Sequence, residues 1–266
     1  MSDEARVPLL AMRGITMRFG AVEALVDVDL EVHAHEVVAL VGDNGAGKST
    51  LAKMISGVLQ PDAGIIEIDG EPVTVPTPQA AAALGVATVF QDLALCENLD
   101  VTSNLFLGRE LRSRWVRDDG QMEEVARRIL RSLSSRIPSV RSPLSTLSKG
   151  QRQSVAIART LIGSPRIVVL DEPTAALSVV QTAEVLTHIE QLRNLGLAVV
   201  LISHNMTDVR AVADRIEVLR HGRNNGSLDV ATSSYEEVIA AITGAPTEPR
   251  PAQHAPLRSS TTAWPA

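Results

Sequence analysis

The chain has 266 residues, of which 45% are hydrophobic, 21% are charged and 2% are aromatic, and its formal net charge is −6. This composition is typical of a globular protein with a core of Ala, Val, Leu and Ile, and the negative charge argues against nucleic acid as a partner. The single cysteine, Cys96, cannot form an internal disulfide, which fits a reducing compartment. No apolar run approaches the roughly 18–20 residues of a membrane span, and the acidic N-terminus is no secretory signal. We therefore expect a soluble, cytosolic protein.

The first part of the chain predicts strands with one buried face. Residues 9–19 and 26–32 alternate apolar and polar side chains around a turn at Gly20, which predicts two antiparallel strands. Residues 37–41 are an apolar strand-like run. After the glycine-rich stretch 42–50, apolar residues recur at the spacing of a helix, at Leu51, Met54, Ile55 and Val58. The next predicted elements are a hairpin of residues 65–68 and 72–75, a helix over 78–84 and a strand over 86–90 that ends at Gln91.

The pattern changes between about residues 92 and 159, where helical signals replace strand signals and residues 109–119 are charged. This predicts an inserted helical region. Alternation of strand and helix then returns, with strands over 167–170, 198–202 and 215–219 and a helix over about 180–195. A last helix is predicted to begin at Ser233, from the capping pattern Ser233-x-x-Glu236, and to end at Gly244. The Pro-, Ser- and Thr-rich tail, residues 245–266, is predicted to be disordered.

Residues 42–50, GDNGAGKST, fit the phosphate-binding loop pattern G-x-x-x-x-G-K-[ST]. The glycines let the backbone turn tightly and direct N–H groups at phosphate oxygens, and the following helix offers its N-terminus to an anion. Lysine supplies a positive charge to the β- and γ-phosphates, and the serine hydroxyl can bind Mg²⁺. The sequence therefore predicts a nucleoside triphosphate site formed by Gly42, Asp43, Asn44, Gly45, Ala46, Gly47, Lys48, Ser49 and Thr50.

A second motif is the apolar run 167–170 followed by Asp171 and Glu172. In a parallel α/β sheet the carboxyl ends of the strands meet at the ligand-binding edge, beside the phosphate loop. Asp171 is therefore predicted to hold the Mg²⁺ shell, and Glu172 to orient or deprotonate the attacking water.

These motifs resemble those of the ATP-binding cassette (ABC) ATPases, over about residues 9–244. The most distinctive match is LSKGQ at residues 147–151, which is similar to the family signature LSGGQ. Gln91 resembles the family's glutamine before the helical region, and His204 its switch histidine. Phe19 occupies the place of the aromatic residue that stacks on adenine, although spacing alone favours a core position for it.

A narrower resemblance points to the sugar-import branch of the family, in the stretches 88–95, 104–110, 173–177 and 203–206. With one phosphate loop and one signature, the chain is similar to the single-cassette members. The resemblance implies an α/β fold with a P-loop NTPase (RecA-like) core, an antiparallel β subdomain and an inserted α-helical subdomain at about 92–159, within an ATPase domain spanning residues 1–244.

The resemblance also implies the roles of individual residues. ATP and Mg²⁺ are the expected ligands, with Ser49, Gln91 and Asp171 at the metal and Glu172, His204 and Gln91 as catalytic residues. The signature residues of a second copy would complete each ATP site, so a homodimer is expected. Those residues are Ser148, Lys149, Gly150 and Gln151.

The expected partners are integral membrane permease subunits and, through them, an extracytoplasmic sugar-binding protein. The expected location is the inner face of a bacterial cell membrane, with the chain in the cytoplasm. Two alternatives remain open: a cassette for a non-sugar solute or for export, and a non-transport ATP-driven switch, which would typically carry two cassettes, a long coiled coil or a basic surface.

Three positions depart from the usual family pattern. Lys149 replaces a glycine, and its side chain either adds charge near the γ-phosphate or crowds the backbone. Ser178 stands where many cassettes have aspartate, which affects communication between the two sites. His35 stands where glycine is more usual. None of the three removes a residue that performs the chemistry.

Overall fold

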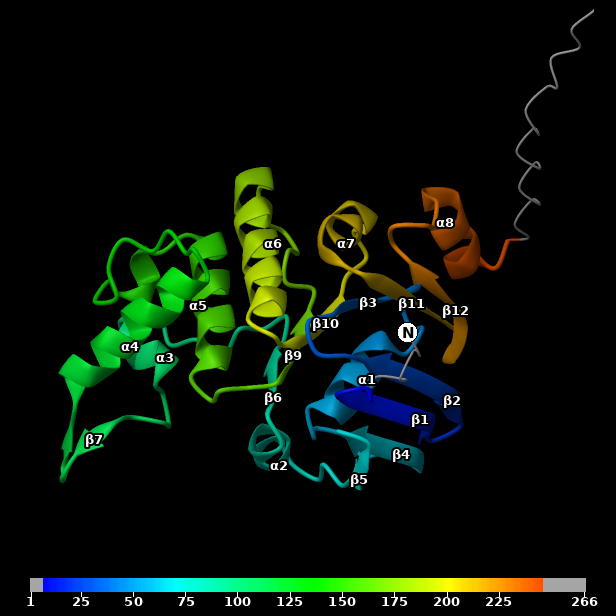
Figure 1. The fold of residues 1–266 in the computed structure, drawn as a ribbon, viewed down its shortest axis with the longest axis horizontal. Helices are drawn as coiled ribbons and strands as arrows, with labels where there is room; N and C mark the ends of the chain where they lie inside the picture. Colours follow the sequence, from blue (N-terminus) through cyan, green and yellow to red (C-terminus); the bar gives the residue numbers. More distant parts are fainter. Residues whose placement is uncertain (1–6, 246–266) are drawn as a thin grey trace, which may run out of the picture.

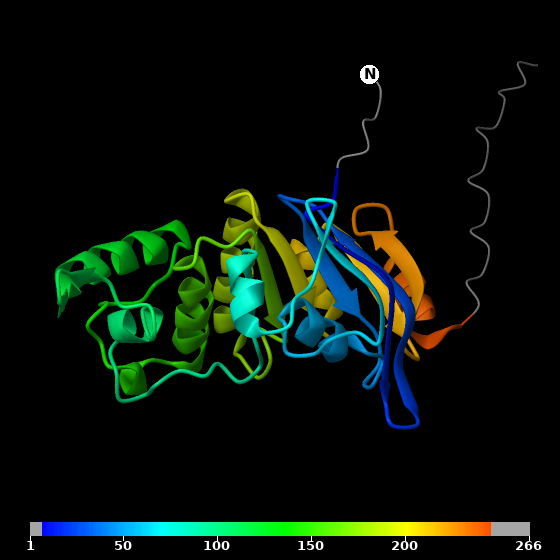
Figure 2. The same cartoon turned by 90° about the horizontal axis from the view of Figure 1, so that it is seen from below.

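The strands form two main sheets, with the helices packed around them (Figures 1 and 2). The computed structural model describes residues 7–245. The central sheet has six strands in the order β12-β11-β3-β10-β9-β6, and all neighbours are parallel except β12, which is antiparallel to β11. Its strands are β3 Val37–Val41, β6 Val86–Val89, β9 Ile167–Asp171, β10 Ala198–Ile202, β11 Arg215–Arg220 and β12 Arg223–Asp229.

The middle strands of this sheet are apolar throughout because both faces are covered. In β3, residues Val37, Ala39 and Val41 pack into the core cluster on one face, and Val38 and Leu40 into the cluster on the other. Successive side chains of a strand point to opposite faces, so a strand between two cores reads as an unbroken apolar run. The predicted strand 37–41 and the strand 198–202 are both confirmed at their predicted bounds.

The second sheet is antiparallel and lies over one face of the central sheet, with the order β2-β1-β4-β5. The predicted pair 9–19 and 26–32 is confirmed, with the second strand longer than expected, and the predicted hairpin around Asp69-Gly70 is confirmed as β4 and β5. The strands are β1 Leu10–Phe19, β2 Val22–Val32, β4 Ala63–Ile68 and β5 Glu71–Val73. Their inward residues share a core cluster with helix α1 (Lys48–Ile55).

Most of the remaining helices cover the other face and one end of the molecule, whereas α2 (Pro78–Ala83) packs through Ala81 into the same core cluster as α1. Helices α3, α4 and α5 gather at the end drawn on the left of Figure 1, within the region predicted to be helical, and β7 and β8 form a small hairpin there. Two-residue strands carry no periodicity, so the hairpin had no strand signal. The elements are α2 Pro78–Ala83, α3 Val101–Leu105, β7 Arg112–Ser113, β8 Val116–Arg117, α4 Asp119–Ser132, α5 Lys149–Leu161, α6 Val179–Asn194, α7 Met206–Val212 and α8 Tyr235–Thr243. None of the helices within residues 7–245 is both long and apolar enough to cross a bilayer.

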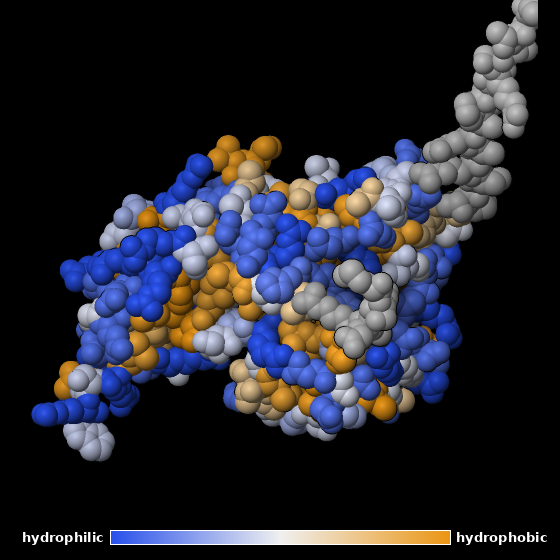
Figure 3. Space-filling view, viewed as in Figure 1, coloured by the Kyte–Doolittle hydropathy of each residue, from blue (hydrophilic) through white to orange (hydrophobic). Residues whose placement is uncertain are grey.

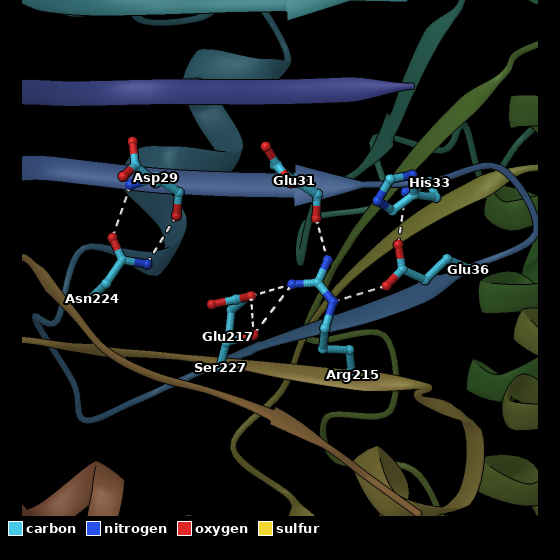
Figure 4. Close-up of polar contacts among 8 residues, drawn as sticks. All are labelled: Asp29, Glu31, His33, Glu36, Arg215, Glu217, Asn224 and Ser227. Carbon is cyan, nitrogen blue, oxygen red and sulfur yellow. Dashed lines mark hydrogen bonds and ion pairs between the residues drawn. The ribbon is translucent and has the colours of Figure 1, made fainter. Parts of the chain in front are cut away.

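Arg215 joins the two sheets (Figure 4). Its guanidinium group, at the start of β11, donates to Glu36 just before β3, to Glu217 on its own strand and to the carbonyl oxygen of Glu31 on β2. Glu217 is 6% exposed and also accepts a hydrogen bond from Ser227 on β12. A buried carboxylate requires such partners. The cluster therefore fixes the antiparallel sheet against the edge of the central sheet.

Three details of the sequence interpretation need correction. Helix α8 begins one residue later than predicted, because Ser234 is the N-cap and forms the capping box with Glu237, while Ser233 and Glu236 do not. The helix after the phosphate loop ends at Ile55, before Val58, which is exposed. Strand β12 was not predicted, since its residues are mostly exposed polar ones. The predicted end of α8 at Gly244 is confirmed by its left-handed C-cap, and the tail 246–266 lies outside the described residues.

Candidate active site

The phosphate loop connects the end of β3 to the start of α1, and two of its glycines have no room for a side chain. Gly47 has φ 104°, and a Cβ atom there would lie 2.4 Å from Cδ2 of Leu25. Gly42 has φ 146°, and a Cβ atom there would lie 2.1 Å from the carbonyl oxygen of Leu219. Both the backbone conformation and the close approach therefore require glycine at these positions.

Lys48 lies inside the loop. Its Nζ atom donates to the carbonyl oxygens of Gly42 and Asp43, at 2.7 and 2.9 Å. Burial lowers the pKa of Lys48, whereas the nearby carboxylates of Glu172, Asp43 and Asp171 act in the opposite direction. These contacts hold the ammonium group at the centre of the loop, where the motif predicts the terminal phosphates.

The two carboxylates follow each other at the carboxyl end of β9. Asp171 is the last residue of the strand, and burial, together with the neighbouring Glu172, raises its pKa. Glu172 has φ 52°, an uncommon conformation for a residue with a side chain, and its N–H group donates to the carbonyl oxygen of Ile202. Strained backbone of this kind concentrates at functional sites. The turn places the Glu172 carboxylate 2.8 Å from Nδ1 of His204, measured to Oε2.

One cavity of about 370 Å³ brings most of the predicted site residues together. Gln91, Asp171, Glu172 and His204, which are far apart in the sequence, all line it beside the phosphate loop. The complete lining is Ala24, Asn44, Gly45, Ala46, Gly47, Lys48, Ser49, Thr50, Gln91, Asp171, Glu172, Ala175, Ile202 and His204.

The oxygen atoms on one side of this cavity suit a hard divalent cation. The Ser49 hydroxyl is hydrogen-bonded to Asp171, and the Gln91 amide lies in the same lining. Hydroxyl, amide and carboxylate oxygens together with phosphate oxygens are the ligands that Mg²⁺ prefers. Within residues 7–245 no three His, Cys, Asp or Glu side chains are grouped so as to hold a metal by themselves. The residues thus fit a cation that is bound jointly with a triphosphate.

The signature residues do not line this cavity. Ser148 is the N-cap of α5 and forms a capping box with Gln151, and Lys149 is exposed, with Nζ 3.5 Å from the carbonyl oxygen of Ala176. Gly150 is buried, and a Cβ atom there would lie 2.7 Å from Cγ of Gln181 on α6. The lysine side chain therefore reaches the loop before α6 in its own chain.

Four further residues differ from what the sequence predicted: Phe19 in its exposure, and three residues in lining the cavity. Phe19 at the end of β1 is 48% exposed, so the core position that spacing favoured is wrong, and a contact with adenine stays a prediction. Ala24, Ala175 and Ile202 line the cavity although none of them was predicted as a site residue. Ala175 belongs to the stretch 173–177 that resembles the sugar-import branch, which was the available signal for it. Ala24 lies beside Gly47, since its carbonyl oxygen would be 2.9 Å from a Cβ atom there.

Known proteins share this arrangement. The model of the ABC transporter family matches residues 25–175, which is more than half of the chain. The chain is 42% identical to the fructose import ATP-binding protein of Rhizobium meliloti, over 93% of this chain and 98% of that protein. It is 43% identical to the xylose/arabinose import ATP-binding protein of Sulfolobus acidocaldarius, over 88% of this chain and 94% of that one. A ribose import ATP-binding protein of Burkholderia ambifaria is also 43% identical, but the chain spans only 47% of its length.

Solved structures agree with these matches. A nucleotide-free ATP-binding cassette from an ABC transporter superposes with a TM-score of 0.77 at 25% identity, over 89% of this chain and 95% of that one. The structure of the ADP conformation of an ATP-binding cassette superposes with a TM-score of 0.77 at 26% identity, with the same coverage of both chains. The expected α/β fold of a P-loop NTPase is thereby confirmed. This chain belongs to the ABC transporter family, as one of its ATP-binding, ATP-hydrolysing cassettes.

Proposed function

We propose that this cassette hydrolyses ATP to drive uptake of a monosaccharide through a membrane permease. The observation that carries the proposal is the single cavity in which the Lys48 loop faces the Glu172–His204 pair, in a chain similar over nearly its whole length to two sugar import proteins. Which monosaccharide is taken up depends on partner proteins. The catalytic domain in this proposal is residues 1–244, with the helical insertion at about 92–159.

The side chains of the cavity have separate tasks in the proposed reaction. Lys48 neutralises charge on the β- and γ-phosphates, while the backbone N–H groups of the loop hold their oxygens. Glu172 orients the attacking water and accepts its proton, and His204, whose Nδ1 atom lies 2.8 Å from that carboxylate, would hold it in position and steady the γ-phosphate. When bound through Ser49, Gln91 and Asp171, Mg²⁺ supplies charge stabilisation to the phosphate oxygens.

A second copy of the chain completes each site in this proposal. Ser148, Lys149, Gly150 and Gln151 lie outside the cavity of their own chain. A two-fold homodimer would bring the signature of one copy to the ATP of the other, which gives two equivalent sites. The two copies would close around the bound ATP, and contacts with the γ-phosphate would supply the free energy of this closure. Hydrolysis would remove those contacts and let the dimer open.

The proposed partners are permease subunits in the membrane and, outside it, a sugar-binding protein that delivers the substrate to them. The cassette would lie on the cytoplasmic face, attached through the permease. The helical region that follows Gln91 joins the ATP cavity to the end of the molecule drawn on the left of Figure 1, so it is the part suited to transmit closure to a permease.

Uptake of radiolabelled pentoses and hexoses tests the function directly. We expect deletion of the gene to abolish uptake of one sugar, and the wild-type chain, but not Lys48→Ala or Glu172→Gln, to restore it. Unchanged uptake across the panel, with ATPase activity intact, would contradict the sugar assignment. It would leave a cassette for another solute as the function.

A further inference from the structure

The β7–β8 hairpin presents a large aromatic side chain to solvent. Trp115 in its turn is 93% exposed and the adjacent Val116 is 71% exposed. The hairpin projects from the end of the helical region, at the lower left of Figures 1 and 3. Single exposed apolar residues are common on protein surfaces, so the exposure alone assigns no partner, and the charge around the tip has to do so. Because the hairpin projects, a contact at this position is made by the tip entering its partner.

The tip is also positively charged. Residues 112–117 hold three arginines and no acidic residue, in a chain whose net charge is −6. Arg117 pairs with Asp119, but Arg112 and Arg114 form no ion pair with any residue of 7–245. The acidic residues of the segment lie at its base and have partners there. Glu110 accepts a hydrogen bond from the N–H group of Gly108, and Asp118 accepts one from Gln121 at the start of α4.

We propose that the β7–β8 hairpin binds the anionic headgroups of the membrane surface. Tryptophan prefers the boundary between headgroups and acyl chains, and arginine pairs with lipid phosphate. A single ring on a narrow hairpin can enter such a boundary, whereas a protein partner of comparable affinity would need a hollow shaped for it. Because the tip is positive and the molecule as a whole is negative, an anionic membrane attracts the tip and not the rest of the surface.

The inference rests on the proposed function, which places the chain at a membrane. The hairpin follows directly from Leu107 and Arg109, which line a cavity of about 290 Å³ together with Phe90, the residue before Gln91. A permease segment in that cavity and lipid at the hairpin would then be bound by neighbouring segments of the chain. Two such contacts on one rigid body act together, because the first raises the effective concentration of the second.

Fluorescence of the full chain tests the proposal without permease or sugar. The chain has two tryptophans, so Trp264→Phe leaves Trp115 as the only one. We expect its emission to shift to shorter wavelength with phosphatidylglycerol vesicles and not with phosphatidylcholine vesicles. Replacing Arg112 and Arg114 by Gln should weaken partitioning about 25-fold, since each arginine near an anionic surface contributes roughly fivefold. Raising the salt concentration should weaken it further.

A matched double variant separates the hairpin from net charge. Arg127 and Arg128 lie on α4 and pair with Glu123 and Glu124, so changing both to Gln removes the same charge from an exposed helix. This variant should retain binding, and ATPase activity should be unchanged in both. The proposal would be overturned if the two double variants lost vesicle binding equally, or if phosphatidylglycerol vesicles did not shift the Trp115 emission. A shift seen only with permease in neutral lipid would assign the hairpin to a protein partner instead. The uptake assay can fail independently of this result.

Discussion

Nε2 of His188 lies 2.8 Å from Oγ of Ser154, and Nδ1 of the same ring lies 2.7 Å from the carbonyl oxygen of Leu133. The imidazole is fully buried and joins three elements, because His188 is on α6, Ser154 is on α5 and Leu133 caps the C-terminus of α4. The Ser154 hydroxyl also lies 3.1 Å from the carbonyl oxygen of Gly150 in the signature. A carbonyl oxygen only accepts, so in the neutral ring Nδ1 donates to Leu133 and Nε2 is left as an acceptor. The single hydrogen of the Ser154 hydroxyl then serves either Nε2 or the carbonyl oxygen of Gly150. This histidine therefore holds the signature helix between the core and the helical region.

Replacing His188 by Leu should destabilise the protein by about 1–3 kcal/mol, because the buried carbonyl oxygen of Leu133 loses the ring as its partner, whereas Ser154 keeps its bond to Gly150. Urea unfolding of the purified chain measures this. Thr187→Ala on the same helix is the control, since its hydroxyl bonds only to a carbonyl group of its own helix. If both variants unfold at the same urea concentration, the buried bridge does not contribute to stability.

His188 should also make stability depend on pH. Burial lowers its pKa below the usual 6.5, against the opposing effects of the Leu133 carbonyl group and of the Glu184 carboxylate. The unfolded chain therefore binds a proton at a higher pH than the folded chain does. The contribution of His188 to stability is complete above its pKa in the unfolded chain. It is lost as the pH falls toward its pKa in the folded chain. Unfolding curves between pH 8 and pH 5 should show less of this loss in His188→Leu than in the wild type, and parallel curves would contradict the assignment.

Glu172→Gln should stop hydrolysis and spare binding. The amide cannot accept the proton of the attacking water, so turnover should fall by about 10²- to 10⁴-fold. Nucleotide binding should persist because Lys48 and the phosphate loop are unchanged. Phosphate release and binding of a fluorescent ATP analogue measure the two effects on the same preparation. Lys48→Ala provides the contrast, since it should weaken binding itself. Turnover near the wild-type level in Glu172→Gln would exclude this residue as the base.

Ser178, which stands where many cassettes have aspartate, has a structural role at the start of α6. It is the N-cap of α6 and forms a capping box with Gln181, the residue that also packs against Gly150. Aspartate is an equally good N-cap, so Ser178→Asp should leave the unfolding midpoint nearly unchanged. Ser178→Ala should cost about 1 kcal/mol. Thermal unfolding distinguishes the two, and equal effects of alanine and aspartate would show that the cap contributes little.

Arg215→Leu should weaken the junction of the two sheets (Figure 4). Burial already raises the pKa of Glu217, and loss of the guanidinium group would leave that carboxylate unpaired, at a cost of about 3–5 kcal/mol. The double variant Arg215→Leu with Glu217→Leu should recover part of the stability, because neither charge then remains buried. Chemical unfolding of both variants checks this. A double variant as unstable as Arg215→Leu alone would show that the loss comes from packing and not from the unpaired charge.

The phosphate loop, the Asp171-Glu172 pair and the strands of the central sheet were predictable from the sequence. Phosphate binding constrains consecutive residues, so Gly42, Gly47 and Lys48 stand at fixed spacing. The strands are equally local, because a strand with a core on both faces must be apolar at every position. Glu172 and His204 could each be assigned a role, but the 2.8 Å contact between them is set by where β9 and β10 end in the sheet.

Tertiary structure decided the contacts between distant or featureless segments. Strand β12 is exposed and polar, and it forms because β11 offers a free edge. The choice of Ser234 over Ser233 as the N-cap of α8 depends on where the preceding turn ends. His188 and Arg215 lie 34 residues from Ser154 and 184 from Glu31, respectively. Local chain geometry thus determined the chemistry of the ATP site, whereas packing between elements determined how its parts are held.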